Sequence, residues 1–133
     1  MPEAQNKKVL IVDDDRFLLN MYSIKFKKSG FDVDTASSGA DALNKLKGDF
    51  VPDIILLDLV MPVMDGCELL QNIRKEKLVP NATVIILSNQ NQASDIDRAK
   101  SLGVAGYIVK ASSIPSEVVA EVVKVVHAAA PKV

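Results

Sequence analysis

The chain has 133 residues, which suffices for one domain whose core needs neither disulfides nor structural metals. Its 16 Lys and Arg residues nearly balance its 17 Asp and Glu residues, so no basic field recruits nucleic acid or an acidic membrane. Cys67 is the single cysteine, which excludes an intramolecular disulfide and favours a reducing compartment. The polar first eight residues predict neither a signal peptide nor a membrane span, so a cytoplasmic location is expected.

The first third of the chain predicts two strand–helix units. Residues 9–12 form a buried-strand run, and apolar residues at helical spacing follow it. That apolar stripe consists of Phe17, Leu18, Met21 and Ile24. Ser29-Gly30 predicts the end of this first helix. Residues 31–36 alternate as a second strand, and residues 38–47 predict a short second helix.

The rest of the chain repeats this alternation three times. Continuous apolar runs predict strands at 54–57, 83–87 and 105–109. The third and fourth helices open with N-capping patterns, formed by Asp65 with Glu68 and by Ser94 with Asp97. The last helix is predicted from Pro115 to about Ala129. Five such units predict a parallel sheet with helices on both faces, because continuous apolar strands require burial on both sides.

Polar residues follow the carboxyl ends of four of these strands. They are Asp13, Asp14, Asp58, Ser88 and Lys110. In an open parallel sheet, ligands bind at the carboxyl ends of the strands, so these side chains are expected to converge. Two carboxylates about 4 Å apart repel by roughly 4 kcal/mol at an effective dielectric near 20, so three of them require a compensating cation.

This set suits a divalent metal ion and a phosphoryl group. Oxygen ligands favour Mg²⁺, whereas the sequence nearby offers no cysteine or histidine for zinc. The carboxylate of Asp58 can attack phosphorus and form an aspartyl phosphate. Mg²⁺ and Lys110 would then stabilise the charge on the equatorial oxygens.

Five motifs resemble the receiver domain of bacterial response regulators, and together they run from about Lys8 to Ala129. They are Val12-Asp13-Asp14-Asp15, the run 52–62, Asp65-Gly66, Ile86-Leu87-Ser88 and Gly106-Tyr107-Ile108-Val109-Lys110. The resemblance implies a flavodoxin-like, doubly wound, five-stranded parallel sheet of order 2-1-3-4-5 with five helices. It also implies a two-component phosphorelay protein of the chemotaxis-type, single-domain architecture. A flexible N-terminus at 1–7, a receiver domain at 8–129 and a tail at 130–133 are expected.

The resemblance also implies a role for each matching residue. Asp58 matches the phosphoacceptor, Ser88 the hydroxyl residue that bonds a phosphoryl oxygen, and Lys110 the lysine beside it. The implied Mg²⁺ ligands are Asp13, Asp14, Asp58 and the main-chain carbonyl of Val60. Tyr107 matches the aromatic switch position, where the ring moves inward and remodels the face made by helix four, strand five and helix five. Such a domain is not an enzyme in the ordinary sense, because it catalyses only its own phosphorylation and dephosphorylation.

Several positions depart from the family pattern. Ala111 follows Lys110 where the family usually has proline after a cis bond, and a cis bond before another residue costs about 3 kcal/mol. Whether the Lys110–Ala111 bond is cis is left open. Asn89 stands where a small residue is common, so we expect it to slow phosphorylation or hydrolysis. The last helix is rich in valine, and its outer apolar edge, chiefly Val123, is a candidate contact for a homodimer or a partner. His127 is expected at the surface and is assigned no chemistry.

Other interpretations stay open at this point. Taken singly, the Asp13–Asp15 triplet could cap a helix, Asp58 could belong to a turn, and Tyr107 could pack in the core. A haloacid-dehalogenase-type phosphatase also uses an Asp-x-Asp pair, here Asp13 and Asp15. A third reading is a degenerate receiver that binds partners without phosphorylation. For the favoured reading, the expected partners are a histidine kinase or a histidine phosphotransfer protein and an unknown output protein. The sequence does not separate a stand-alone receiver from part of a longer regulator.

Overall fold

The computed structural model describes residues 7–48, 50–89, 93–110 and 114–129, with residues 93–96 and 127–129 described by their backbone alone. Within these residues the strands form one parallel sheet of order β2-β1-β3-β4-β5, which confirms the predicted order. The strands are β1 (Lys8–Val12), β2 (Asp32–Ala36), β3 (Ile54–Leu57), β4 (Thr83–Ser88) and β5 (Gly106–Val109).

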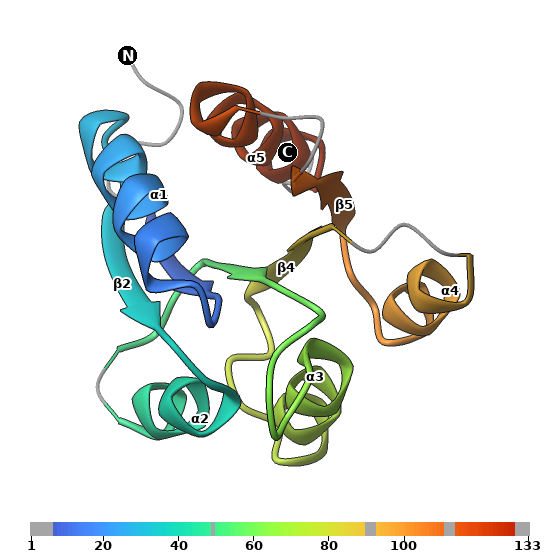
Figure 1. Ribbon diagram of the computed structural model, residues 1–133. Coiled ribbons are helices and arrows are strands. Elements are labelled where there is room, and N and C mark those ends of the chain that lie inside the picture. Colours follow the sequence, from blue (N-terminus) through green and yellow to red (C-terminus); the bar gives the residue numbers. More distant parts are fainter. Residues whose placement is uncertain (1–6, 49, 90–92, 111–113, 130–133) are drawn as a thin grey trace.

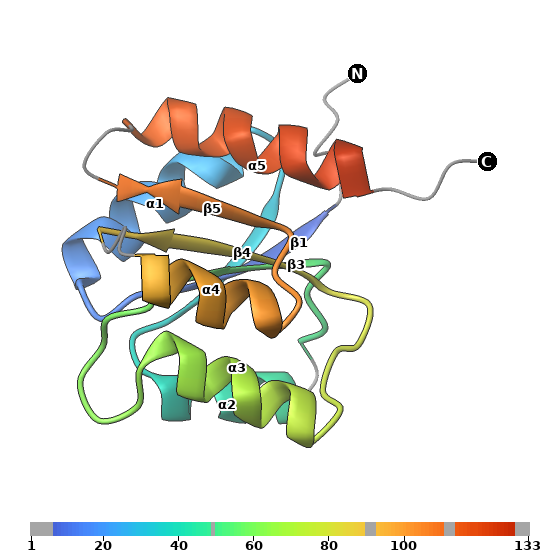
Figure 2. The same cartoon turned by 90° about the vertical axis from the view of Figure 1, so that its right-hand side faces the viewer.

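Helices cover both faces of the sheet, as a doubly wound fold requires. They are α1 (Arg16–Lys28), α2 (Gly39–Lys47), α3 (Gly66–Lys75), α4 (Ala93–Ser101) and α5 (Pro115–Ala129). Helices α1 and α5 lie on one face, and α2, α3 and α4 lie on the other (Figures 1 and 2). No helix in the described part of the chain has the length and apolar character that crossing a bilayer would require.

Alternate residues of each central strand supply the two halves of the core. Leu10 and Val12 pack toward α2 and α3, whereas Val9 and Ile11 pack toward α1 and α5. All four residues of β3 are fully buried. Burial on both faces explains why these strands are continuous apolar runs in the sequence.

The helix starts agree in part with the predicted caps. The Asp65 carboxylate accepts a hydrogen bond from the Glu68 N–H at 2.8 Å, which confirms the predicted start of α3. The Asp15 carboxylate caps α1 in the same way. Helix α4 already includes Ser94, so the prediction that it begins after this residue is wrong, and the cap contact lies outside the described side chains.

The apolar stripe that predicts α1 overlaps only in part with the face that this helix buries, because Leu18 packs partly buried against the core. The buried residues are Leu19, Tyr22 and Phe26, whereas Phe17 is 76% exposed and Ile24 is 49% exposed. The ring of Phe26 meets Phe31 edge to face, with centroids 5.0 Å apart. Helix α1 therefore faces the core with Leu19, Tyr22 and Phe26.

Helix α5 buries a narrower stripe than its composition suggests. Val118, Val119 and Val122 are buried, and Val123 is partly buried against the same core. Gly106 in β5 permits this close packing, because a Cβ atom there would lie 3.1 Å from Val125. The structure does not test the predicted homodimer contact at Val123, and the His127 side chain lies outside the described residues.

Candidate functional site

Residues from four strand ends meet in one cavity at the carboxyl edge of the sheet. The cavity has a volume of about 430 Å³ and is lined by Asp13, Asp14, Asp15, Leu18, Asp58, Val60, Ser88, Asn89 and Lys110. Strands β1 and β3 are neighbours in which Val12 pairs with Leu57, and the Asp58 N–H donates to the Val12 carbonyl at 3.0 Å. The predicted convergence of these side chains is confirmed.

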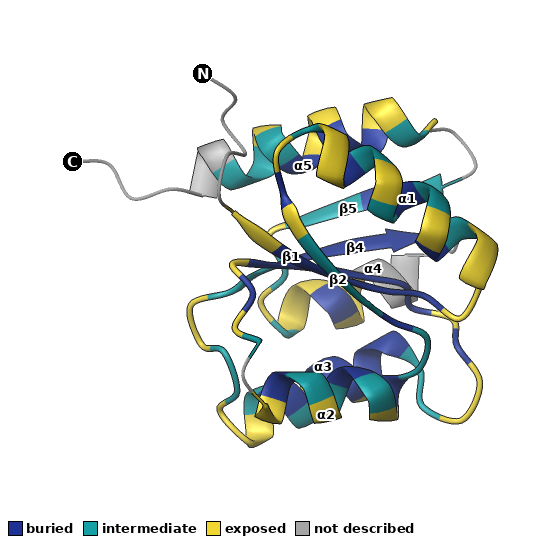
Figure 3. Cartoon of the chain, turned by 90° about the vertical axis from the view of Figure 1, so that its left-hand side faces the viewer, coloured by how far each residue is buried: buried dark blue, intermediate teal, exposed yellow. Residues whose placement is uncertain are grey.

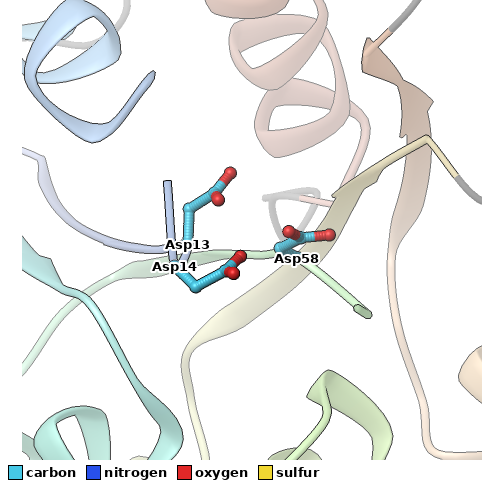
Figure 4. A group of neighbouring side chains, drawn as sticks. All are labelled: Asp13, Asp14 and Asp58. Atoms are coloured by element: carbon cyan, nitrogen blue, oxygen red, sulfur yellow. The ribbon is translucent and has the colours of Figure 1, made fainter. Parts of the chain in front are cut away.

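Three carboxylates of this cavity form a candidate metal centre. Asp13, Asp14 and Asp58 each offer an oxygen, and these three oxygens lie within 4.8 Å of one another (Figure 4). Asp13 and Asp58 are buried, whereas Asp14 is exposed. Hard oxygen donors with one side open to water fit Mg²⁺, which usually keeps several water ligands.

Lys110 brings a positive charge directly to these carboxylates. Its ammonium donates to Asp58 Oδ2 at 3.2 Å and to Asp13 Oδ2. Only 9% of the Lys110 side chain is exposed, and the Asp13 and Asp58 side chains are more buried still, at 3% and 8%. Lys110 therefore compensates part of the acidic charge from the side of β5.

Burial changes the acidity of these groups. Burial raises the pKa of Asp58 above its ordinary value, and the Lys110 ammonium counteracts only part of this effect while Asp13 adds to it. Burial alone would lower the pKa of Lys110, but its hydrogen bond to Asp13 and the charge of Asp58 hold that pKa above the usual range. Lys110 is thus expected to carry its positive charge at neutral pH.

Backbone donors and one glycine fix the acidic loops. Asp13 Oδ1 accepts from the Asp15 N–H at 2.9 Å, and Asp58 Oδ1 accepts from the Val60 N–H at 3.3 Å. The Gly66 N–H donates to the Leu59 carbonyl at 2.8 Å, and a Cβ atom on Gly66 would lie 2.3 Å from the Asp58 carbonyl oxygen. Sequence reasoning used Gly66 only as part of a motif and missed this contact.

The remaining predicted residues belong to β4 and β5, which follow β3 in the order of the sheet. Ser88 ends β4, is fully buried and lines the cavity, and Asn89 lines it as well. Tyr107 lies in β5 opposite Ile86 of β4, and it packs partly buried against the core on the α3 side. The Lys110–Ala111 bond falls outside the described residues.

Comparison with known proteins identifies the family. The family model named response regulator receiver domain matches residues 9–122. The chain belongs to the response regulator receiver domain family.

Relatives of this receiver domain differ in length. This chain is 36% identical over 117 residues to the alkaline phosphatase synthesis transcriptional regulatory protein PhoP of Bacillus subtilis. The match covers 88% of this chain and 47% of that protein. The chain is 37% identical over 120 residues to the chemotaxis protein CheY of Thermotoga maritima, covering 90% of this chain and 97% of that protein. The chain thus spans about half the length of the transcriptional relatives and nearly all of this chemotaxis protein.

Solved structures agree with the fold of this receiver domain. The chemotaxis protein CheY4 of Vibrio cholerae matches with a TM-score of 0.80 and 29% identity, covering 90% of this chain and 98% of that one. The CheY-like receiver domain protein of Methanospirillum hungatei matches with a TM-score of 0.81 and 25% identity, covering 90% and 93%. The flavodoxin-like fold is confirmed, and the family consists of signalling proteins rather than of classical enzymes.

Proposed function

We propose that this receiver domain, covering residues 8–129, is a phosphorylation-dependent switch of a two-component system in which Asp58 is the phosphoacceptor. The observation that carries the proposal is the buried Asp58 carboxylate, which shares one cavity with Asp13, Asp14 and the Lys110 ammonium. The family assignment supports the same reading. It gives no support to the phosphatase alternative.

Six residues of the cavity have a part in the proposed transfer. An oxygen of Asp58 forms a bond to phosphorus while the bond from phosphorus to the donor nitrogen breaks. The Lys110 ammonium and the Ser88 hydroxyl would donate hydrogen bonds to the transferred phosphoryl oxygens. Mg²⁺, held by the carboxylates of Asp13, Asp14 and Asp58 and by the Val60 carbonyl, would neutralise charge on the phosphoryl group.

The site lies next to the strands that would carry the signal. Ser88 ends β4, and Tyr107 lies in β5, which pairs with β4 along its length. A phosphoryl group on Asp58 would draw the Ser88 loop toward it, and the Tyr107 ring would follow inward. The surface formed by α4, β5 and α5 then changes shape and binds an output protein.

The donor follows from the chemistry of the acceptor. A phosphohistidine of a histidine kinase or of a histidine phosphotransfer protein would supply the phosphoryl group, and the reaction would take place in the cytoplasm. Members with the same family domain include regulators named as transcriptional and proteins named for chemotaxis. The output of this chain is therefore an interaction with a partner of unknown identity, and no direct contact with nucleic acid or membrane is proposed for the receiver domain.

The decisive experiment is intact-mass spectrometry after incubation with acetyl phosphate, with and without Mg²⁺. We expect a single phosphoryl adduct on the wild type in Mg²⁺ and none on Asp58→Asn. Asp97→Asn is the matched control, because Asp97 is exposed on α4 and does not line the cavity. An adduct that persists in Asp58→Asn contradicts the assignment of Asp58. Mg²⁺ binding without any adduct on the wild type, with a phosphohistidine donor included, indicates the degenerate receiver instead.

A further inference from the structure

Within the described residues, no strand pairs with the outer edge of β2 (Figure 3). The peptide groups of Asp32 and Ala36 face β1, because the Asp32 N–H donates to Lys7 at 2.9 Å and the Ala36 carbonyl accepts from Asp13 at 3.1 Å. Backbone groups alternate in direction along a strand. The peptide groups of Val33 and Thr35 therefore face outward, where another strand could pair with them.

One ion pair occupies both outward groups of Thr35. The Thr35 N–H donates to Asp34 Oδ1 at 2.8 Å, and the Thr35 carbonyl accepts from the Lys45 ammonium of α2. Lys45 Nζ and Asp34 Oδ1 are themselves 2.9 Å apart. The three contacts close a ring, so the backbone donor and the backbone acceptor are both taken at one of the two outward-facing residues of the free edge.

The role of this ion pair is indicated by its location rather than by its contribution to stability. The two side chains are 30% and 36% exposed, and ion pairs at such exposure contribute little net stability. A bare strand edge, by contrast, is a ready template for pairing with another chain, and charged side chains placed on it prevent that pairing. We propose that the Asp34–Lys45 pair guards the edge of β2 against pairing with β2 of a second copy of this chain.

A second copy is the occupant that this edge fits by symmetry. Two copies related by a two-fold axis place their β2 strands antiparallel, and each edge then offers the donors and acceptors that the other needs. The two sheets would join into one continuous sheet. Before this can happen, Lys45 and Asp34 must both release Thr35, because they hold the groups that the incoming strand would use.

The test compares two charge-neutral double variants. Asp34→Ala/Lys45→Ala removes the guard. Glu76→Ala/Lys47→Ala removes a comparable pair, with a separation of 3.2 Å, which links the residue after α3 to α2. Each variant loses one positive and one negative charge, so the net charge stays at −1. Sedimentation velocity over a wide concentration range is expected to show self-association of the guard variant with a dissociation constant at least about tenfold below that of the control variant.

Hydrogen exchange locates the contact. We expect the amides of Val33 and Thr35 to become protected as the concentration of the guard variant rises, and Lys45→Arg to behave as the wild type. A folded guard variant that stays as monomeric as the wild type overturns the proposal, as does association without protection at these two amides. If the guard variant does not fold, hydrogen exchange of the wild type provides the test. The Thr35 amide of the wild type should exchange more slowly than its Val33 amide, and equal rates contradict the proposal that the ion pair occupies this edge.

Discussion

At the scale of single residues, the burial of the Asp58 carboxylate has a cost to the fold. Its carboxylate is buried beside Asp13, and Lys110 offsets this burial only in part, so its pKa lies above the ordinary value. A carboxyl whose pKa is raised in the folded state binds protons more tightly there than in the unfolded chain. Ionisation of Asp58 therefore lowers the free energy of unfolding as the pH rises.

Asp58→Asn should accordingly stabilise the protein in Mg²⁺-free buffer at neutral pH, by on the order of 1 kcal/mol. The stability difference from the wild type should be absent below the unfolded pKa near 3.8, grow as the pH rises through the raised folded pKa, and then stay constant. Lys110 keeps its bond to Asp13 in this variant. Urea denaturation across this pH range measures the effect, and a variant less stable than the wild type at neutral pH contradicts the account.

Val63 is a second residue held in an unfavourable state. It has a φ of 69°, in the left-handed region that β-branched residues rarely adopt, and its side chain is fully exposed. Val63→Gly should therefore raise the free energy of unfolding by about 1 kcal/mol, since strain is relieved and no packing is lost. Val51→Gly is the control, because Val51 is 60% exposed without a positive φ, and there glycine should destabilise. Equal losses in both variants would show that Val63 is not strained.

At the scale of elements, the start of α3 packs against the backbone that follows β3, and the contact requires a residue without a Cβ atom. Gly66 lies directly against the Asp58 carbonyl, so any Cβ atom there would displace the backbone of the proposed phosphoacceptor. The helix and the acidic loop thus depend on each other for their positions.

Gly66→Ala should lower the free energy of unfolding by about 1–3 kcal/mol and reduce phosphorylation by acetyl phosphate, because the added methyl group overpacks a backbone contact. Gly48→Ala serves as the control, since a Cβ atom there meets its nearest neighbour at 3.5 Å and the φ of Gly48 is −91°. Chemical denaturation and the adduct yield provide the two readouts. A Gly66→Ala variant with the wild-type free energy of unfolding and the wild-type adduct yield would show that α3 and the acidic loop do not depend on this contact.

The sequence predicts the strands and the convergence of the site better than the orientation of the helices. Strands buried on both sides appear as uninterrupted apolar runs, and the residue after each run is placed by the topology alone. Helix α1 carries more apolar residues than one face can bury, so Phe17 and Ile24 define the periodicity while Leu19, Tyr22 and Phe26 face the sheet. The contact of Gly66 with the Asp58 backbone depends on how closely two backbone segments approach, and the contacts of Lys45 join a helix to a strand edge. The periodicity of apolar residues contains no information about either.

At the scale of the whole molecule, the acidic site exists only in the folded state. Asp13 and Asp14 follow β1, and Asp58 follows β3, so pairing of these two strands brings the three carboxylates together. An ion that binds this arrangement and not the unfolded chain stabilises the fold by mass action.

Mg²⁺ should therefore raise the free energy of unfolding, by about 2.7 kcal/mol at a concentration one hundred times its dissociation constant. Asp14→Asn should lose most of this gain, and because Asp14 is exposed its core packing stays intact. Asp97→Asn should respond to Mg²⁺ as the wild type does. Thermal unfolding with and without the ion measures the shift, and an equal response of Asp14→Asn and the wild type would exclude Asp14 as a ligand.

The direction of the strands determines where a label or a tether can be attached without covering the acidic cavity. The strands run toward the acidic cavity, while the start of β1 and the end of α5 lie at the opposite edge of the sheet (Figure 2). A fluorophore, a surface tether or a fused reporter attached before Lys8 or after Ala129 would thus leave the acidic cavity facing the solution. When the domain is immobilised at either position, its acidic cavity stays accessible to metal ions and phosphoryl donors in solution.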